Sequence, residues 1–301
     1  MNLRRLKYFV KIVDLESLTL ASDVLHVAQP ALSQQLATLE GECKQKLLVR
    51  TQKGVEPTEA GRVLYRHAQA ILRHVEQARA DVQNAGRSLV GQVSVGLAPG
   101  TAASTLALRL LQVVQGRHPQ IVLHINENLG TTLFDAVRKG TMDMAVLYGG
   151  EGPAQGLSFD LLTKEALCVV APAGSLRKDE ISLQDLGDVD LLLPCSGNQL
   201  RRYVDRAFAT VRMAPRVVAE MESSSTLSAA IGSRVGATIL PASVARAVAA
   251  TANAELHQLI SPVIEVPLVL CASDHLPMSE PAQVVRGILL ELVGEDMSSP
   301  A

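Results

Sequence analysis

Apolar residues recur at helical spacing through the first sixty residues, in three short stretches with polar residues between them. One stripe runs from Leu3 to Val13, and a second begins after Ser17, a residue type that commonly caps a helix N-terminus. A third stretch begins at Gln29, with Pro30 in its first turn, where the missing N–H of proline costs no hydrogen bond. The pattern predicts three short helices in a compact bundle.

Beyond Thr58 the apolar positions alternate at intervals of four and three residues, which is a heptad repeat. This heptad seam consists of Leu64, Ala68, Ile71, Val75, Ala78, Val82, Ala85 and Leu89. Polar side chains fill the other faces and no proline interrupts them, so one long helix over residues 59–90 is predicted. We expect it to dimerise through Leu64, Ala68, Ile71, Val75, Ala78 and Val82. Packing of the helix on its own domain is the alternative.

After Gly91, short β-rich runs alternate with helical ones, which is typical of βαβ units with parallel sheets. The first series of expected elements is 93–98, 102–115, 121–125, 131–139 and 144–148. The second series is 191–194, 200–211, 217–221, 226–234 and 237–240. Two strand-like runs, 157–162 and 166–170, separate the series, and a strand at 264–271 followed by a helix at 282–293 returns the chain to the first lobe. The fold class is therefore α/β, with a first lobe of about 91–162 and 267–301 and a second of about 163–266.

The composition narrows the class of protein. A chain of 301 residues suits two or three folding units, and no apolar run approaches the ~20 residues of a membrane span, so no membrane partner is expected. The basic N-terminal residues are not followed by an apolar stretch, and no export signal is expected. The four cysteines show neither C-x-x-C nor zinc-ligand spacing. We expect a cytoplasmic, reduced protein without a metal.

Charge is distributed unevenly along the chain. Up to Val90 there are 13 Lys and Arg against 9 Asp and Glu, whereas the remainder holds 15 against 21. A mildly basic front therefore precedes an acidic body, which indicates a polyanion partner for the front.

Residues 17–40 read as a helix, a short turn and a second helix of a length that fits the major groove of DNA. In this helix-turn-helix, Gln29, Ser33 and Gln34 lie at the start and on one exposed side of the second helix. Glutamine amides pair with adenine edges, and serine serves either type of base. Around the turn that follows, Arg50, Thr51 and Lys53 are expected to lie along phosphates, as in a wing.

The chain closely resembles the LysR-type transcriptional regulators over its full length. The matching positions are Phe9, Ser17, Ala21, Leu25, Gln29, Pro30, Ala31, Leu32, Ser33, Leu39, Glu40, Leu47, Arg50, Thr51, Pro57, Thr58, Ala60 and Gly61. The resemblance implies that the segment containing Pro30 begins the recognition helix, that Arg50 and Thr51 open the wing, and that the long helix dimerises the DNA-binding domains. It also implies that the body is two Rossmann-like lobes resembling periplasmic binding proteins, with an inducer cleft between them. The expected domains are an all-α winged helix-turn-helix at 1–58, a linker helix at 59–90 and an effector-binding domain at 91–301.

Three positions depart from the family pattern: Ser22 replaces alanine, Lys44 replaces a turn glycine, and Leu48 replaces phenylalanine. Within the family, Gln34-Gln35 and residues 91–104 look most like the nitrogen assimilation control branch. The implied partners are double-stranded DNA, a second copy of the chain in a dimer or tetramer, and RNA polymerase at promoters. Control would come from a small ligand or from the protein's own abundance.

The ends of strands that precede helices are candidate ligand sites, because helix N-termini present unpaired N–H groups there. We expect a small polar or anionic effector held by Thr101, Ser196 and backbone amides, with Asn128 as a further donor. The full candidate set is Pro99, Gly100, Thr101, Ala102, Asn128, Ser196, Gly197, Asn198 and Ser223. The alternative is that these residues are ordinary helix caps.

Three other functions have less support in the sequence. A redox role for Cys195 would need a second cysteine nearby, and Cys168 and Cys271 are both expected in buried strands. No H-E-x-x-H, G-x-S-x-G or P-loop motif is present, so neither catalysis nor a cofactor is expected. A solute-binding protein without a DNA role is the alternative function, but it has no use for a helix-turn-helix. The sequence predicts a homo-oligomeric regulator that reads an interrupted inverted repeat in DNA.

Overall fold

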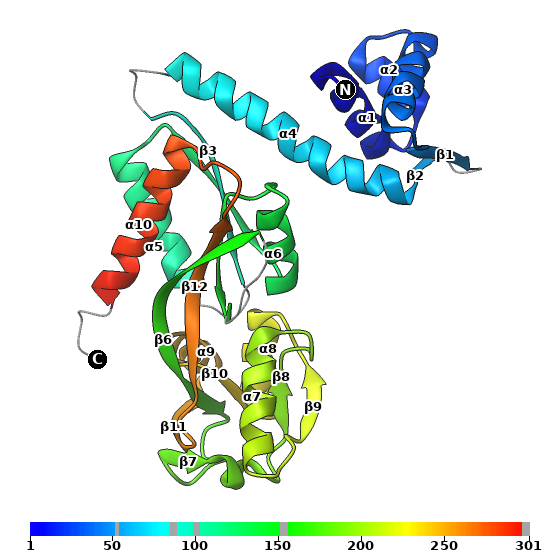
Figure 1. Ribbon diagram of the computed structural model, residues 1–301. Coiled ribbons are helices and arrows are strands. Elements are labelled where there is room, and N and C mark those ends of the chain that lie inside the picture. The colour runs from blue at the N-terminus through cyan, green and yellow to red at the C-terminus, as the bar shows by residue number, and fades with distance from the viewer. Residues whose placement is uncertain (52–53, 85–88, 99–102, 151–155, 297–301) are drawn as a thin grey trace. The chain divides into compact units, whose positions relative to one another are not determined.

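The computed structural model describes residues 1–51, 54–84, 89–98, 103–150 and 156–296 (Figure 1). The chain divides into two compact units, Met1–Gly86 and Arg87–Ala301, which are described separately. No helix among the described residues combines the length and apolar composition needed to cross a bilayer.

The first unit contains the three predicted helices, a two-stranded hairpin and the long helix. Its elements are α1 (Leu3–Leu15), α2 (Leu18–Leu25), α3 (Gln29–Cys43), β1 (Leu48–Thr51), β2 (Gly54–Pro57) and α4 (Glu59–Asn84). Asn2 and Ser17 cap α1 and α2, since their side-chain oxygens accept hydrogen bonds from the N–H groups of Arg5 and Leu20. Strands β1 and β2 pair antiparallel and form the wing, so the unit is helical except for this hairpin.

The core of this unit follows the predicted helical faces, with one exception. Phe9, Leu32 and Leu39 are fully buried, as their spacing predicts. The apolar stripe expected on α2, made of Leu20, Ala21, Val24 and Leu25, is wrong in part, because Leu20 is 54% and Val24 52% exposed. The helix buries Ala21 of that stripe together with Leu18 and Ser22.

Lys44 ends α3 in the left-handed conformation, with φ of 50°. Glycine adopts this conformation without strain, whereas a residue with a Cβ pays about 1–2 kcal/mol. The turn for which the family pattern has glycine is therefore formed here by lysine, whose side chain is exposed.

The first lobe of the second unit is a sheet covered on both faces. It contains β3 (Gly91–Leu97), α5 (Ala103–Arg117), β4 (Ile121–Glu127), α6 (Gly130–Arg138) and β5 (Met144–Tyr148), and the three strands are parallel in the order β4-β3-β5. Alternate residues of β5 face opposite sides, as in any strand. Val146 packs in one hydrophobic cluster with Leu110, while Leu147 packs in another with Leu133 of α6.

A single long strand connects the lobes, where the sequence predicted two strands. Strand β6 (Leu157–Ala171) pairs antiparallel with β12 (Glu265–Ser273) through Ala166 and with β10 (Thr238–Pro241) and β11 (Glu255–Ser261) beyond it. The polar residues between the two apolar runs stay in the strand because β12 supplies their backbone hydrogen bonds. The sheet is therefore mixed: β3, β4 and β5 run parallel, as the βαβ pattern predicts, and β12 runs antiparallel to β5 and β6 (Figure 1).

The second lobe and the return to the first complete the body. Its further elements are β7 (Glu180–Ser182), a 3-10 helix (Leu183–Leu186), β8 (Leu191–Leu193), α7 (Gln199–Thr210), β9 (Val217–Glu220), α8 (Ser224–Gly232), α9 (Ala242–Ala252) and α10 (Glu280–Asp296). Helix α10 packs beside α5 in the first lobe, as the predicted return of the chain requires. The sequence pattern missed β7, the 3-10 helix, α9 and β11.

Candidate functional site

The start of α3 offers polar side chains to the solvent. The exposed residues there are Gln29, Pro30 and Gln34, and Ser33 is half-buried. The other face of the helix carries Leu32 and Leu39, which are buried against α1 and α2. Among the described residues, no side-chain hydrogen bond is formed by the amides of Gln29 and Gln34. Such amides can replace their hydrogen bonds to water with hydrogen bonds to base edges.

The wing docks on the end of α1. The N–H of Val55 donates to the carbonyl oxygen of Glu16 at 2.8 Å. A Cβ at Gly54, whose φ is 138°, would lie 2.3 Å from that oxygen, so only glycine fits here. Arg50 and Thr51 end β1, and Thr51 is exposed. Lys53 lies outside the described residues.

Glu40, which the site prediction did not include, joins α3 to the wing. Its carboxylate accepts hydrogen bonds from Lys46 Nζ at 2.7 Å and from the N–H groups of Leu47 and Leu48 at 2.9 and 3.3 Å. Burial alone would raise the pKa of Glu40, but these hydrogen bonds outweigh burial and lower it below its usual value. The carboxylate therefore stays ionised near neutral pH and holds β1 at the end of α3.

The heptad seam is divided between two environments. Leu64, Ala68 and Ile71 pack with Leu6 and Phe9 of α1 in the core of their own unit. Ala68 is fully buried there, which favours the alternative that this part of the helix packs on its own domain. The rest of the seam is more accessible: Val75 is half-buried, Ala78 is exposed, and Val82 is 77% exposed. Leu89 lies beyond α4 and packs on the core of the second unit, while Ala85 is outside the described residues.

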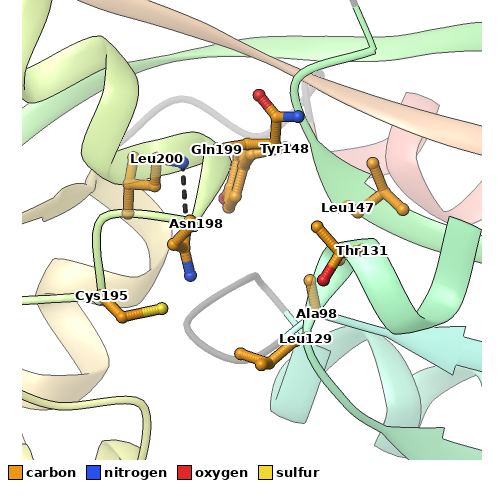
Figure 2. A pocket seen from close by; sticks show the side chains of 11 residues that line it. Ala98, Leu129, Thr131, Leu147, Tyr148, Cys195, Asn198, Gln199 and Leu200 are labelled. Atoms are coloured by element: carbon orange, nitrogen blue, oxygen red, sulfur yellow. Dashed lines mark hydrogen bonds between the residues drawn. The ribbon is translucent and has the colours of Figure 1, made fainter.

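A pocket of about 150 Å³ opens in the second unit where the N-termini of α6 and α7 meet. Leu129, Gly130 and Thr131 line it from the first lobe, and Gly197 and Asn198 from the second (Figure 2). The other lining residues are Ala98, Leu147, Tyr148, Cys195, Gln199 and Leu200. The two helix N-termini direct backbone N–H groups and the positive ends of helix dipoles toward this space.

The predicted effector residues divide into three groups. Gly197 and Asn198 line the pocket, and their role in binding an effector stays a prediction. Asn128, Ser196 and Ser223 do not line it; Asn128 accepts a hydrogen bond from the N–H of Leu129, and Ser223 caps α8. The residues 99–102, with the predicted Pro99, Gly100, Thr101 and Ala102, lie outside the described residues.

Asn198 and Cys195 are held in place by Glu222. The Asn198 side chain accepts from the N–H of Leu200 at 2.9 Å and donates to Glu222 at 3.1 Å, and the N–H of Cys195 donates to the same carboxylate at 2.9 Å. The hydrogen bond with Glu222, aided by burial, raises the pKa of the Cys195 thiol. A thiol with a raised pKa is a poor nucleophile, which weakens the redox alternative.

Tyr148 and Glu165 link the pocket wall to the second lobe. The Tyr148 hydroxyl donates to one oxygen of Glu165 at 2.7 Å, and the N–H of Ser243 at the start of α9 donates to the other at 3.0 Å. The ring of Tyr148 thus lines the pocket while its hydroxyl is held by Glu165. Sequence reasoning missed Tyr148, because nothing in its local pattern distinguishes it from a core strand residue.

Known proteins identify both units. Residues 3–62 match the family described as "Bacterial regulatory helix-turn-helix protein, lysR family", and residues 86–294 match "LysR substrate binding domain". The nitrogen assimilation regulatory protein nac of Klebsiella aerogenes is 47% identical and that of Escherichia coli 44% identical, each over 97% of this chain and 95% of its own length.

Solved structures share the fold. A point variant of full-length OxyR from Pseudomonas aeruginosa has a TM-score of 0.72 at 23% identity and covers 97% of this chain and 94% of its own. CbnR complexed with its target DNA has a TM-score of 0.71 at 22% identity and covers 97% of this chain and 100% of its own. With both family matches spanning nearly the whole sequence, the chain belongs to the LysR family of bacterial helix-turn-helix transcriptional regulators.

Proposed function

We propose that the chain binds operator DNA as a dimer, reads an interrupted inverted repeat through α3, and regulates genes of nitrogen metabolism. The exposed start of α3 carries the first part, since Gln29 and Gln34 present their amides to the solvent while buried leucines hold the other face of the helix in the core. A two-fold dimer requires two half-sites on the DNA. The nitrogen role rests on the 47% and 44% identity with the two nitrogen assimilation regulators.

The contacts divide into those that read bases and those that position the protein. In this proposal Gln29, Ser33 and Gln34 contact base edges, Pro30 approaches the same groove, and Arg50, Thr51 and Lys53 contact phosphates. The operator is obtained by selecting genomic fragments on the purified protein. Gln29→Ala should then cost about 1–3 kcal/mol on that operator and relax the base preference at one position.

Lys53→Ala provides the contrast in the same binding assay. Removing one phosphate contact should weaken operator and random duplexes alike and lower the salt slope by about one. Equal losses from both variants on operator and random DNA would contradict the division between reading and positioning. Selection that enriches no two-fold motif from the wild-type protein would contradict the proposed function itself.

The second unit is proposed to bind a small polar or anionic effector in the pocket between α6 and α7. The side chains of Asn198 and Thr131 and the backbone of Gly197 offer polar groups at the two helix N-termini, and Tyr148 and Leu129 supply apolar walls. A space of about 150 Å³ suits a ligand close in size to one benzene ring. Control by the abundance of the regulator, without a ligand, is the competing scheme.

Titration calorimetry with a panel of small anionic and amide metabolites tests this pocket. Gly197→Phe, which fills the mouth next to Asn198, should abolish the heat of binding of any ligand found. The exposed Gly116 of α5, where no atom lies within 4 Å of an added Cβ, supplies the control Gly116→Ala, which should bind as the wild type does. A ligand bound equally by Gly197→Phe would place the effector elsewhere, and a panel without heat would favour control by abundance.

The remaining assignments complete the proposal. Residues 1–58 bind DNA, 59–90 dimerise, and 91–301 bind the effector, with lobes of about 91–162 with 267–301 and about 163–266. The regulator acts in the cytoplasm as a dimer or tetramer and contacts RNA polymerase at promoters. It carries out no catalysis.

A further inference from the structure

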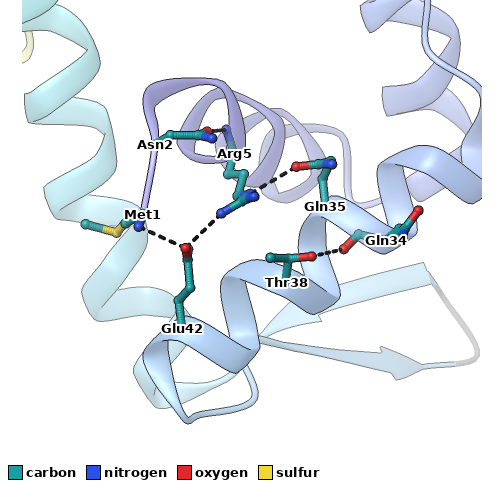
Figure 3. A network of polar contacts seen from close by, with 7 residues as sticks. All are labelled: Met1, Asn2, Arg5, Gln34, Gln35, Thr38 and Glu42. Atoms are coloured by element: carbon teal, nitrogen blue, oxygen red, sulfur yellow. Dashed lines mark hydrogen bonds and ion pairs between the residues drawn. The ribbon is translucent and has the colours of Figure 1, made fainter.

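The guanidinium of Arg5 on α1 spans two turns of the recognition helix α3. Its Nε donates to Gln35 Oε1 at 3.0 Å, and its Nη1 donates to Glu42 Oε1 at 2.8 Å (Figure 3). Gln35 and Glu42 are seven residues apart and so lie on one face of α3. The Arg5 side chain is only 21% exposed, and the amine of Met1 lies 3.1 Å from the same Glu42 oxygen.

The hydrogen bonds of Arg5 distinguish two adjacent glutamines, Gln34 and Gln35. Gln35 is half-buried and uses its side-chain oxygen to accept from Arg5. Gln34 is exposed, and the hydrogen bond at that residue goes from Thr38 Oγ1 to its backbone oxygen at 2.8 Å, which leaves its amide outside the network (Figure 3). The side chain of Gln35 is therefore committed within the protein, while that of Gln34 faces the solvent.

We propose that the pair Arg5 and Gln35 fixes the rotation of α3 about its axis and is thereby a determinant of operator specificity without touching a base. Side-chain ends lie about 6 Å from a helix axis, so a rotation of about 10° moves them by about 1 Å. Bidentate hydrogen bonds to base edges do not survive such a shift, whereas the attraction between cations and phosphates changes little. The inference rests on the proposed operator binding.

The test compares the ratio of random-duplex Kd to operator Kd, measured by fluorescence anisotropy, for four variants of the full chain. Gln35→Met keeps the length of the side chain and removes its acceptor, and Arg5→Met removes the donor while Met1 still pairs with Glu42. Each should lower the ratio about tenfold, the loss of one bidentate base contact. Gln35→Glu keeps an acceptor for Arg5, so it should weaken binding to both duplexes and retain the ratio.

Arg4→Met is the matched control for charge. Arg4 is exposed and forms no hydrogen bond or ion pair within the described ranges. Its loss should weaken both duplexes equally and leave the ratio unchanged. Thermal melting of each variant separates a shifted helix from an unfolded one, since a lower ratio measured well below the melting temperature reports on geometry.

Each outcome decides the inference. A lower ratio in Gln35→Met and Arg5→Met, retained in Gln35→Glu and Arg4→Met, supports it. The inference is overturned if Gln35→Met keeps the Kd ratio of the wild type. It is also overturned if Arg4→Met or Gln35→Glu lowers the Kd ratio as much as Gln35→Met does. Both outcomes leave the proposed function intact. A wild-type protein with a ratio of one overturns the proposed function and the inference together.

Discussion

Gly61→Ala should destabilise the DNA-binding unit by about 3 kcal/mol or more and lower its melting temperature by about 10–20 °C. Gly61 lies in the first turn of α4, and a Cβ there would be 2.0 Å from the carbonyl oxygen of Leu47 and 3.2 Å from Pro57. Both neighbours belong to the wing and its approach, so backbone must move to make room. Rotation of a flexible side chain cannot relieve this clash.

The cost of this movement extends to the hydrogen bonds around the junction. The N–H of Thr58 donates to the Leu47 oxygen at 2.9 Å, and the Thr58 hydroxyl donates to the Lys46 oxygen at 2.6 Å. A Cβ at Gly61 pushes directly on the acceptor of the first bond. A shift of the Leu47 carbonyl also disturbs its N–H, which donates to Glu40. The expected loss is therefore large for a single methyl group.

Gly41→Ala is the control for this prediction. Gly41 is an exposed position within α3 with no atom within 4 Å of the added Cβ. Alanine should there stabilise the helix by about 0.5–1 kcal/mol, because it restricts the unfolded chain. Differential scanning calorimetry of the full chain measures both variants. A Gly61→Ala protein that melts within about 2 °C of the wild type, an interval set at roughly half the shift that 1 kcal/mol causes, would contradict the predicted clash.

Val82→Glu should abolish most of the advantage that a complete operator has over a single half-site. Two linked half-site contacts exceed one by about 10²–10⁴ in affinity. Val82 is 77% exposed on the far part of the heptad seam, and a charge there is compatible with the isolated helix but not with a paired apolar seam. The variant should bind a half-site duplex as the wild type does and bind the complete operator about 100-fold more weakly.

Val63→Glu is the matched control, because Val63 is 40% exposed and lies about 100° around α4 from the seam. It should retain the advantage of the complete operator. Anisotropy titrations on half-site and full-site duplexes measure the difference. If Val82→Glu kept the wild-type advantage, dimerisation through the accessible part of the seam would be wrong.

Local signals in the sequence were sufficient for the DNA-binding helices. A capping serine at Ser17, a proline at Pro30 and leucines at helical spacing placed α2 and α3 correctly, and with them the exposed face that carries Gln29 and Gln34. These signals work because helix caps and helix faces depend on residues three or four apart. The turn after α3 forms with Lys44 in place of the family's glycine, because the left-handed conformation involves only the local backbone.

Some sequence patterns are compatible with two structures, and only the packing of the folded chain shows which one forms. The spacing of Leu64, Ala68 and Ile71 suits a partner helix as well as the domain's own core, and contact with α1 selects the core. Two apolar runs became one strand, β6, because its hydrogen bonds come from β12, about a hundred residues later in the chain. No local sequence pattern indicates that β6 and β12 pair.

The sites show the same division. From the sequence by itself came the family, the recognition helix and two of the pocket residues, Gly197 and Asn198, because each depends on short-range patterns. Only the tertiary structure brought Tyr148 to the pocket wall and joined Arg5 to Gln35 across thirty residues. Side chains that meet through folding share no spacing that a pattern can reveal, since their distance is set by the packing of whole helices and strands.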